Sequence, residues 1–214
     1  CFIGILIGAR LGHCLFYEPA YYFSNPIKFL YVWEGGLASH GGAIGILIGL
    51  YIYAKKIDKP YLWILDRIVV PVAIGGAFIR MGNLMNSEIY GQPTDLPWGF
   101  KFVRDYPIGT PIENIPACHP TQIYEALFCV AVFVYLLYAY YKQNMAERRP
   151  GFMFGIFLIV VFGSRILIEF IKNHQVAFED NMLLDMGQWL SIPFLIAGIY
   201  FVARSFFKTE NLKN

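Results

Sequence analysis

Six long apolar segments, separated by polar connections, limit the fold of this chain more than any other feature. A helix needs about 20 mostly apolar residues to cross the hydrocarbon core of a bilayer, and all but the first segment approach that length. Glycine and proline inside the segments do not argue against helices, because membrane helices tolerate both. The pattern predicts an all-α fold, a polytopic membrane helix bundle with about six spans. We expect these at residues 1–17, 36–54, 61–81, 121–141, 151–171 and 188–207.

The composition supports a membrane protein. The 214 residues are 57% hydrophobic and only 15% charged, whereas soluble domains are about half apolar and about a quarter charged. A net charge of +2 is too small to indicate a nucleic-acid partner. The four cysteines form no Cys-x-x-Cys pair, so we expect neither a disulfide framework nor a zinc site.

The chain shows no internal repeat, so we treat residues 1–214 as a single integral membrane domain. It begins inside an apolar run, with no initiator methionine and no basic flank. A signal peptide would begin with a charged stretch, so we expect an N-terminally truncated membrane helix instead.

The distribution of lysine and arginine predicts the orientation. Basic residues concentrate on the cytoplasmic side of membrane proteins. One set of connections, with the C-terminal end, holds Lys55, Lys56, Lys59, Lys142, Arg148, Arg149, Arg204, Lys208 and Lys213. The alternate set is longer and holds only Lys28, Lys101, Arg104 and Lys172. We therefore expect the first set to be cytoplasmic and the second to face outward.

The longest outward connection spans residues 82–120. Loops of this length are usually functional or disordered. This one mixes charged residues with Pro97, Trp98, Phe100 and Phe102. Such a composition favours a folded cap on the membrane surface.

Charged side chains inside the spans are costly and are usually functional. Asp66 and Arg67 are expected at the cytoplasmic interface. The predicted topology places the others, with two histidines, at one depth near the outer leaflet. They are Arg10, His40, Arg80, His119, Glu125, Arg165 and Glu169.

This concentration of charge suggests a polar cavity. An Arg–Glu pair inside a membrane often does no more than join two helices, and that alternative stays open for any single pair. Three arginines, however, exceed what local pairing needs. Because a guanidinium matches phosphate oxygens bidentately, the excess favours an anionic ligand such as a phospholipid head group.

Four stretches carry more information than composition. Residues 35–42 read Gly-Gly-Leu-Ala-Ser-His-Gly-Gly, which taken alone favours a helix start packed by small residues. Residues 80–91 read Arg-Met-Gly-Asn-Leu-Met-Asn-Ser-Glu-Ile-Tyr-Gly, and residues 119–125 read His-Pro-Thr-Gln-Ile-Tyr-Glu. The fourth is Arg165-Ile-Leu-Ile-Glu169, followed by Met-Gly-Gln-Trp-Leu-Ser-Ile-Pro at 186–193.

Together and in this order, the motifs resemble those of the prolipoprotein diacylglyceryl transferase family. The string Arg-x-Gly-Asn-x-x-Asn-x-Glu-x-Tyr-Gly is the most specific of them. The resemblance runs from about Gly8 to Gly198. It implies seven membrane helices in the full-length family, of which we expect the first to be absent here. Val161 stands where some members of the family have tyrosine.

The resemblance implies transfer of a diacylglyceryl group from phosphatidylglycerol to the thiol of a lipobox cysteine in a prolipoprotein. A thioether forms and glycerol phosphate leaves, as the first step of bacterial lipoprotein maturation. The implied partners are phosphatidylglycerol, the prolipoprotein signal peptide with its lipobox cysteine, and the lipid bilayer. The implied location is the bacterial cytoplasmic (inner) membrane, with the active site towards the outer leaflet.

Roles follow for individual residues. We expect Arg80 and Arg165 to stabilise phosphate charge and His40 to act as general base, because imidazole titrates near neutral pH. Glu88 is an alternative base. Tyr124, Glu125 and Glu169 are expected to hold the arginines. The full set of expected substrate-binding residues is Gly41, Asn83, Asn86, Glu88, Gly91, His119, Tyr124, Glu125, Glu169 and Arg10.

We expect no cofactor and no metal ion. The sequence has no His-Glu-x-x-His motif, and His40 and His119 have no partnering ligand pattern.

Two other classes of function deserve comparison. A transporter of anionic lipids would also need arginines, but it should show internal repeats and charge at the midplane, and we find neither. A structural membrane subunit would not account for the ordered polar motifs.

Overall fold

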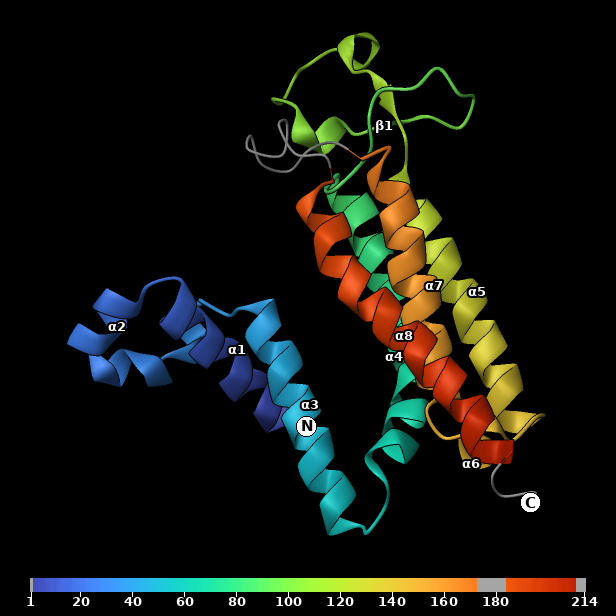
Figure 1. Ribbon diagram of the computed structural model, residues 1–214. Helices are drawn as coiled ribbons and strands as arrows, with labels where there is room; N and C mark the ends of the chain where they lie inside the picture. Colours follow the sequence, from blue (N-terminus) through green and yellow to red (C-terminus); the bar gives the residue numbers. More distant parts are fainter. Residues whose placement is uncertain (1, 173–183, 211–214) are drawn as a thin grey trace. The chain divides into compact units, whose positions relative to one another are not determined.

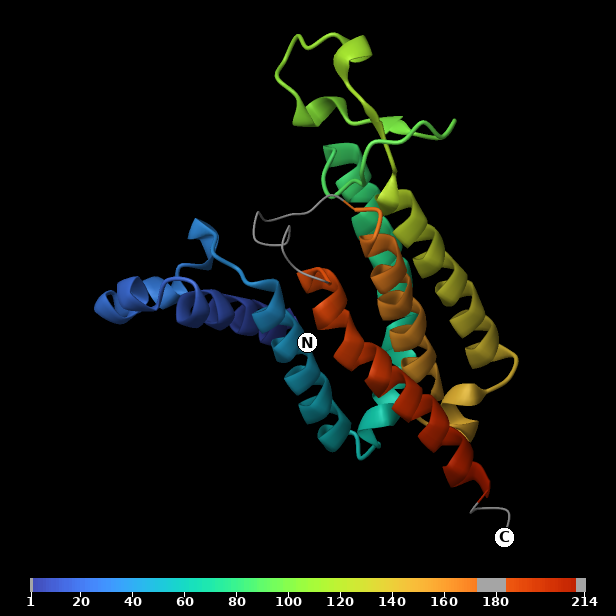
Figure 2. The same cartoon turned by 45° about the horizontal axis from the view of Figure 1, so that its top comes forward.

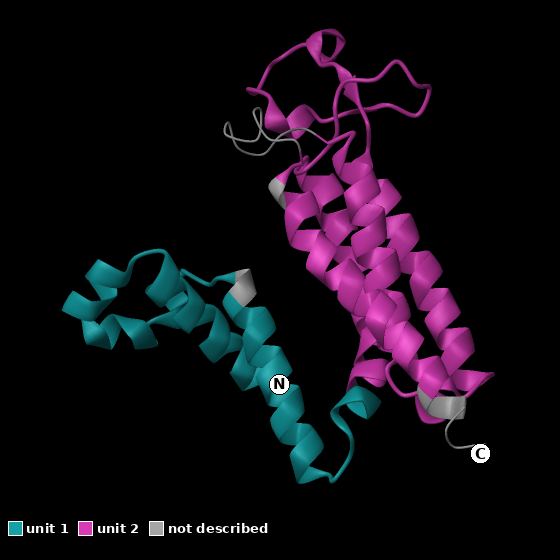
Figure 3. Cartoon of the chain, viewed as in Figure 1, with its two compact units in different colours: residues 1–64 teal, residues 65–214 magenta. Residues whose placement is uncertain are grey.

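The computed structural model describes residues 2–172 and 184–210. The chain forms two compact units, Cys1–Ile64 and Leu65–Asn214 (Figure 3). The single membrane domain expected from the sequence stays a prediction.

The first unit is built on two helices, α1 (Phe2–Phe16) and α3 (Ser39–Lys56), which pack against each other (Figure 1). The segment between them contains the short helix α2 (Pro19–Ser24) and two 3-10 turns, η1 (Pro26–Leu30) and η2 (Val32–Glu34). A helix therefore occupies most of each predicted apolar segment, 1–17 and 36–54, although α3 begins three residues later than predicted and ends at Lys56.

Glycines bring the backbones of α1 and α3 into direct contact. A Cβ atom on Gly41 would lie 2.1 Å from the carbonyl oxygen of Gly8, and one on Gly45 would lie 2.0 Å from that of Gly4. Small residues permit such close approach between membrane helices. In this unit Gly41 therefore serves helix packing, as the glycine-rich stretch taken alone suggested.

The second unit is a helix bundle. Figures 1 and 2 show α4 (Tyr61–Asn86), α5 (Thr121–Tyr141), α7 (Phe152–Glu169) and α8 (Met186–Glu210) side by side. The short helix α6 (Met145–Arg148) leads into α7. The buried core comes from α4, α5, α6 and α7, and comprises Val69, Ala73, Val132, Leu136, Ala139, Ala146, Phe152 and Met153.

Four helices in the described ranges, namely α4, α5, α7 and α8, are long and apolar enough to cross a membrane. Helix α1 is apolar but shorter, and α3, with its glycines and terminal lysines, is not among the four. The bundle also exposes large apolar side chains, among them Phe78, Leu127 and Leu167. Soluble proteins rarely expose so much apolar surface, so these helices form a multi-pass membrane protein whose natural solvent is lipid.

The predicted bounds are accurate for α5 and wrong for the end of α4. Helix α4 runs past residue 81 to Asn86, so Arg80 and Asn83 lie on the helix and the long connection begins at Ser87. That connection contains β1 (Phe100–Lys101), β2 (Ala117–Cys118), η3 (Val103–Asp105) and η4 (Ile112–Asn114).

The connection 87–120 is folded, as its composition predicted. Strands β1 and β2 are antiparallel, with Phe100 opposite Cys118. The ring of Tyr90 stacks on Phe102 with centroids 4.4 Å apart, and its hydroxyl donates a hydrogen bond of 2.5 Å to Asp105. Burial, followed by this bond to Asp105, raises the pKa of Tyr90, so the phenol stays protonated as a donor.

Asp66 is fully buried, whereas the sequence placed it at the interface. Its carboxylate accepts hydrogen bonds from two backbone amides at the start of α7, from Gly151 at 2.6 Å and from Phe154 at 2.8 Å. The first amides of a helix have no partner within the helix. Asp66 on α4 therefore caps α7 from another helix.

We predict that Asp66→Ala lowers the stability of the purified protein. The change leaves the amides of Gly151 and Phe154 without their acceptor, and an unpaired amide costs about 1–3 kcal/mol when it is fully buried. Asp66→Asn, which keeps one acceptor oxygen, should cost less. Thermal unfolding in detergent measures this, with the exposed Asp95→Ala as control. Equal midpoints for the Asp66→Ala and Asp95→Ala proteins would contradict a capping role.

Candidate active site

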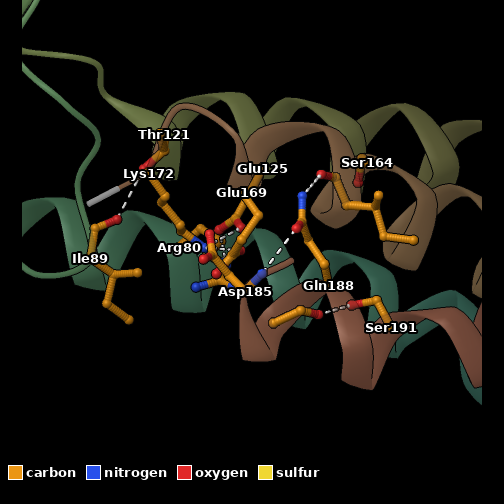
Figure 4. A network of polar contacts seen from close by, with 12 residues as sticks. Arg80, Ile89, Thr121, Glu125, Ser164, Glu169, Lys172, Asp185, Gln188 and Ser191 are labelled. Atoms are coloured by element: carbon orange, nitrogen blue, oxygen red, sulfur yellow. Dashed lines mark hydrogen bonds and ion pairs between the residues drawn. The ribbon is translucent and has the colours of Figure 1, made fainter. Parts of the chain in front are cut away.

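Arg80 and Glu125 form an ion pair at one end of the bundle. Arg80 lies near the end of α4 and Glu125 in the second turn of α5. The Nε atom of Arg80 is 2.6 Å from Oε2 of Glu125 (Figure 4). The contact is an ion pair by distance, but Oε2 has no hydrogen bond of good geometry. The expectation that Glu125 holds an arginine agrees with this contact.

Lys172 completes the arrangement. Its Nζ atom lies 2.9 Å from Oε1 of Glu125 and 3.3 Å from Oε2 of Glu169, and the residue is 3% exposed. Arg80, Glu125, Glu169 and Lys172 form a group that we call the four-charge cluster (Figure 4). With two positive and two negative side chains the cluster has no net charge. Burial favours such a balance, because a buried charge without a partner is costly.

No role was predicted for Lys172, which stands in the sequence among the charges of the outward loops. A signal was available, because Lys172 follows Glu169 by three residues, which is the spacing of neighbouring side chains on a helix.

Glu169 was expected to hold an arginine, with Arg165 on the same helix face. Among the described residues its carboxylate pairs with Lys172 instead. Gly187 lies against this carboxylate, where a Cβ atom would be 2.5 Å from Oε1. The Nε atom of Arg165 is buried and has no hydrogen-bond partner within residues 2–172 and 184–210. Arg165 nevertheless lies one turn before Glu169, at the same end of the bundle as Arg80.

The loop after α4 has a strained backbone. Ser87 and Ile89 have φ angles of 59° and 58°, and this left-handed region is unusual for any residue other than glycine and costly for a β-branched one. Asn83 helps to hold the turn, because its Nδ2 donates to Oε2 of Glu88 at 3.0 Å and its backbone carbonyl accepts the amide of Glu88. Asn86 is the last, exposed residue of α4. Strain of this kind clusters at functional sites.

The first turn of α5 fixes this strained loop. Nε2 of Gln122 donates to the carbonyl of Glu88 at 2.6 Å, and Oγ1 of Thr121 donates to the carbonyl of Ile89 at 2.9 Å. Both side chains are fully buried. The motifs at 80–91 and 119–125 therefore form one structural unit.

Gly91 lies where the loop meets two other elements. Its amide donates to the carbonyl of His119 at 2.9 Å, and it forms an antiparallel bridge with Lys172. A Cβ atom would lie 2.5 Å from the carbonyl oxygen of Ile171. The expected close backbone approach is present, and its partner here is the end of α7.

Tyr124 was expected to hold an arginine. Its hydroxyl instead accepts a hydrogen bond of 2.9 Å from Nε1 of Trp98 and lies 3.4 Å from Nδ1 of His119. His119 and Tyr124 thus connect the cap to the start of α5, and we find no contact of Tyr124 with an arginine in the described ranges.

In the first unit, Arg10 is buried and used by its own loop. Its guanidinium lies 5.1 Å from the ring centroid of Tyr22. All three of its nitrogens donate to loop carbonyls, those of Lys28, Phe29, Gly35 and Gly36. These contacts hold the loop between α1 and α3, and the expected role of Arg10 in ligand binding stays a prediction.

The side chain of His40 lies outside the described part of the chain, although its backbone belongs to α3. Because Arg10 and His40 belong to the first unit and Arg80 to the second, their convergence stays a prediction.

Cys118 is the one cysteine in the cap, and its thiol is buried in a small cluster with Leu84 and Phe102. Burial raises the pKa of this thiol, so it stays protonated at neutral pH. Since the thiolate is the nucleophile in cysteine chemistry, Cys118 is poorly suited to attack a substrate.

Arg80 is the side chain best placed to bind an anion. Glu125 holds it through Nε, and neither Nη1 nor Nη2 makes a hydrogen bond to any described residue. The side chain is 20% exposed. A guanidinium anchored in this way can present two parallel N–H donors to phosphate or carboxylate oxygens.

Comparison with known proteins shows the family. A model of the family described as "Prolipoprotein diacylglyceryl transferase" matches residues 1–204. The chain is 50% identical over 210 residues to a protein of Porphyromonas gingivalis, covering 95% of this chain and 74% of the relative. It is 47% identical over 199 residues to one of Tolumonas auensis, covering 92% and 73%.

A protein of Bacteroides fragilis is 45% identical over 214 aligned positions, covering 94% of this chain and 74% of the relative. All three relatives carry the name phosphatidylglycerol–prolipoprotein diacylglyceryl transferase. The matched length, the level of identity and the ordered motifs agree, and the chain belongs to the prolipoprotein diacylglyceryl transferase family.

Proposed function

We propose that this protein transfers a diacylglyceryl group from phosphatidylglycerol to the lipobox cysteine of a prolipoprotein. The relatives' names state the donor and the acceptor protein. The observation in the structure that carries the proposal is the position of Arg80, which Glu125 holds through Nε while both terminal nitrogens stay available. Such a donor pair suits the phosphate of an anionic lipid.

We place the protein in the bacterial cytoplasmic (inner) membrane, with the four-charge cluster towards the outer leaflet. The bias of lysine and arginine supports this orientation. The end of the bundle that carries Asp66 connects through the basic 142–150 segment, whereas the cluster lies at the opposite end, beside the cap.

The reaction requires a new bond from sulfur to carbon. The substrate thiol loses its proton to a base, and the resulting thiolate attacks the carbon of the diacylglyceryl group that carries the phosphate ester. The C–O bond to phosphate breaks as the C–S bond forms, and glycerol phosphate leaves with the bonding electrons. Negative charge develops on the leaving oxygens, where Arg80 and Arg165 stabilise it in a site poor in water.

The remaining residues have supporting roles in this proposal. His40 is the base, with Glu88 as the alternative, and Glu88 already accepts a hydrogen bond from Asn83. Asn83 Oδ1 is buried without a partner among the described residues, as an atom awaiting a head-group donor would be. Gly91 allows the strained loop to approach the end of α7.

A mass measurement tests the function. A lipobox peptide is incubated with the full-length protein and phosphatidylglycerol. We expect the peptide to gain one diacylglyceryl unit on its cysteine, with release of glycerol phosphate. A peptide whose cysteine is replaced by serine should stay unmodified. Lipid consumption without any gain of mass on the cysteine peptide would contradict the proposal.

We predict that Arg80→Ala and Arg165→Ala each reduce transfer severely, on the order of 10²–10³-fold, because each removes a donor to developing charge. Lysine at either position should rescue poorly, since it offers a point charge without the planar fork. Arg67→Ala is a matched control, because Arg67 lies on α4 at the opposite end and pairs with Glu147 at 2.5 Å. Turnover of either alanine variant close to that of Arg67→Ala would show that the arginine is structural.

We further predict direct transfer to the substrate thiol without a lipidated enzyme. Burial keeps the Cys118 thiol protonated, so Cys118→Ser should retain near-normal turnover, whereas His40→Gln should be severely impaired. Mass spectrometry of the intact enzyme during turnover should find no lipid adduct. An inactive Cys118→Ser variant, together with a diacylglyceryl adduct on the wild-type protein, would make Cys118 the first acceptor.

A further inference from the structure

Lys172 is a buried lysine that the proposed reaction does not use. It follows the end of α7, and its Nζ reaches Glu125 on α5 and Glu169 on α7 at 2.9 and 3.3 Å. With a side chain only 2% exposed, it cannot reach a lipid head group without leaving both carboxylates. Its charge therefore acts on its neighbours in the protein.

The net charge of the four-charge cluster, and the way Glu125 contacts Arg80, depend on Lys172. Glu125 touches Arg80 through one oxygen and Lys172 through the other. Without Lys172, Arg80 alone would face two carboxylates, and the cluster would have a net charge of −1. An unpaired buried carboxylate is costly, so Glu125 would recruit the Nη donors of Arg80, and the remaining negative charge would repel an anionic ligand.

We propose that Lys172 is a positioning residue for anion binding by Arg80. It satisfies the free oxygen of Glu125 and pairs with Glu169, so that Glu125 holds Arg80 only through Nε. The two Nη groups then remain directed to the phosphate of the anionic lipid. This inference rests on the proposed function, because it takes Arg80 as the phosphate-binding group.

The backbone of Lys172 has a separate role that its side chain does not share. It forms the bridge with Gly91, and its carbonyl lies 3.5 Å from Nε2 of Gln92. Ile171, its neighbour, accepts the amide of Gln92 at 2.9 Å. These backbone contacts attach the strained loop after α4 to the end of α7 whatever the side chain at position 172 is. A substitution at Lys172 therefore tests the side-chain charge.

The test compares three variants of the full-length protein with the wild type. Lys172→Met removes the charge and keeps an unbranched apolar side chain of similar length, Lys172→Arg keeps the charge, and Lys172→Met/Glu169→Gln restores a neutral cluster. The control is Lys142→Met, at an exposed lysine that follows α5 at the opposite end of the bundle. Two assays are used. Steady-state kinetics give kcat and the KM for phosphatidylglycerol, and native mass spectrometry gives the binding of phosphatidylglycerol relative to zwitterionic phosphatidylethanolamine.

We expect Lys172→Met to raise the KM on the order of tenfold and to weaken the preference for phosphatidylglycerol, because one unit of charge beside a bound anion is worth that much or more. Lys172→Arg should stay close to wild type. The neutral double variant should recover a clear part of the loss, which a purely structural lysine would not allow. Lys142→Met should match wild type.

Two results would overturn the inference. One is a Lys172→Met protein with the KM and lipid preference of wild type. The other is a folded double variant whose KM and lipid preference are no closer to wild type than those of the single variant. If Lys172→Met fails to fold, a folded double variant that has lost the preference for phosphatidylglycerol overturns the inference. The binding measurement keeps the two proposals distinguishable. A wild-type protein that binds phosphatidylglycerol but transfers nothing would refute the function, whereas an unchanged lipid preference in Lys172→Met would refute only the role of Lys172.

Discussion

Glu125 is the carboxylate on which the polar end of the bundle depends. It lies on α5, yet its two oxygens contact a cation from α4 and a cation beyond the end of α7. In a bilayer these three charges could not remain apart, because each would be desolvated without compensation. The pairing therefore joins three segments and at the same time fixes the direction of the Arg80 guanidinium. In the proposed site, the contacts that stabilise the bundle also orient the group that we assign to ligand binding.

The strained loop after α4 is the second requirement of the site. Ile89 accepts a left-handed conformation because side chains of α5 hold the adjacent carbonyls and Gly91 docks on the end of α7. Such a loop presents amide and carboxylate groups without needing to order on binding, which lowers the entropic cost of holding a ligand. The helices supply the rigid support, and the loop supplies the irregular backbone that regular helices cannot.

Because the length of an apolar run and the thickness of a bilayer are directly related, the sequence predicted the long apolar helices, but not the end of α4. It placed Arg80, Glu125 and Arg165 at one end of the bundle, since alternating topology fixes depth. It did not show which groups each charged side chain contacts. The partners of Arg10 are backbone carbonyls, which every residue has. Lys172 was missed because it lies just beyond the predicted helix and was counted with the outward loop charges, although its spacing of three residues from Glu169 was a signal.

We propose that Arg80, at one end of the bundle, binds the phosphate of an anionic lipid. A structure of the full-length protein with phosphatidylglycerol bound tests this directly. We predict a phosphate oxygen within about 3 Å of an Nη atom of Arg80, the distance of a charge-assisted hydrogen bond, with Glu125 still on Nε. A head group bound at the opposite end of the bundle, or an Arg80 whose Nη atoms are turned into Glu125 while the lipid is bound elsewhere, would contradict the account.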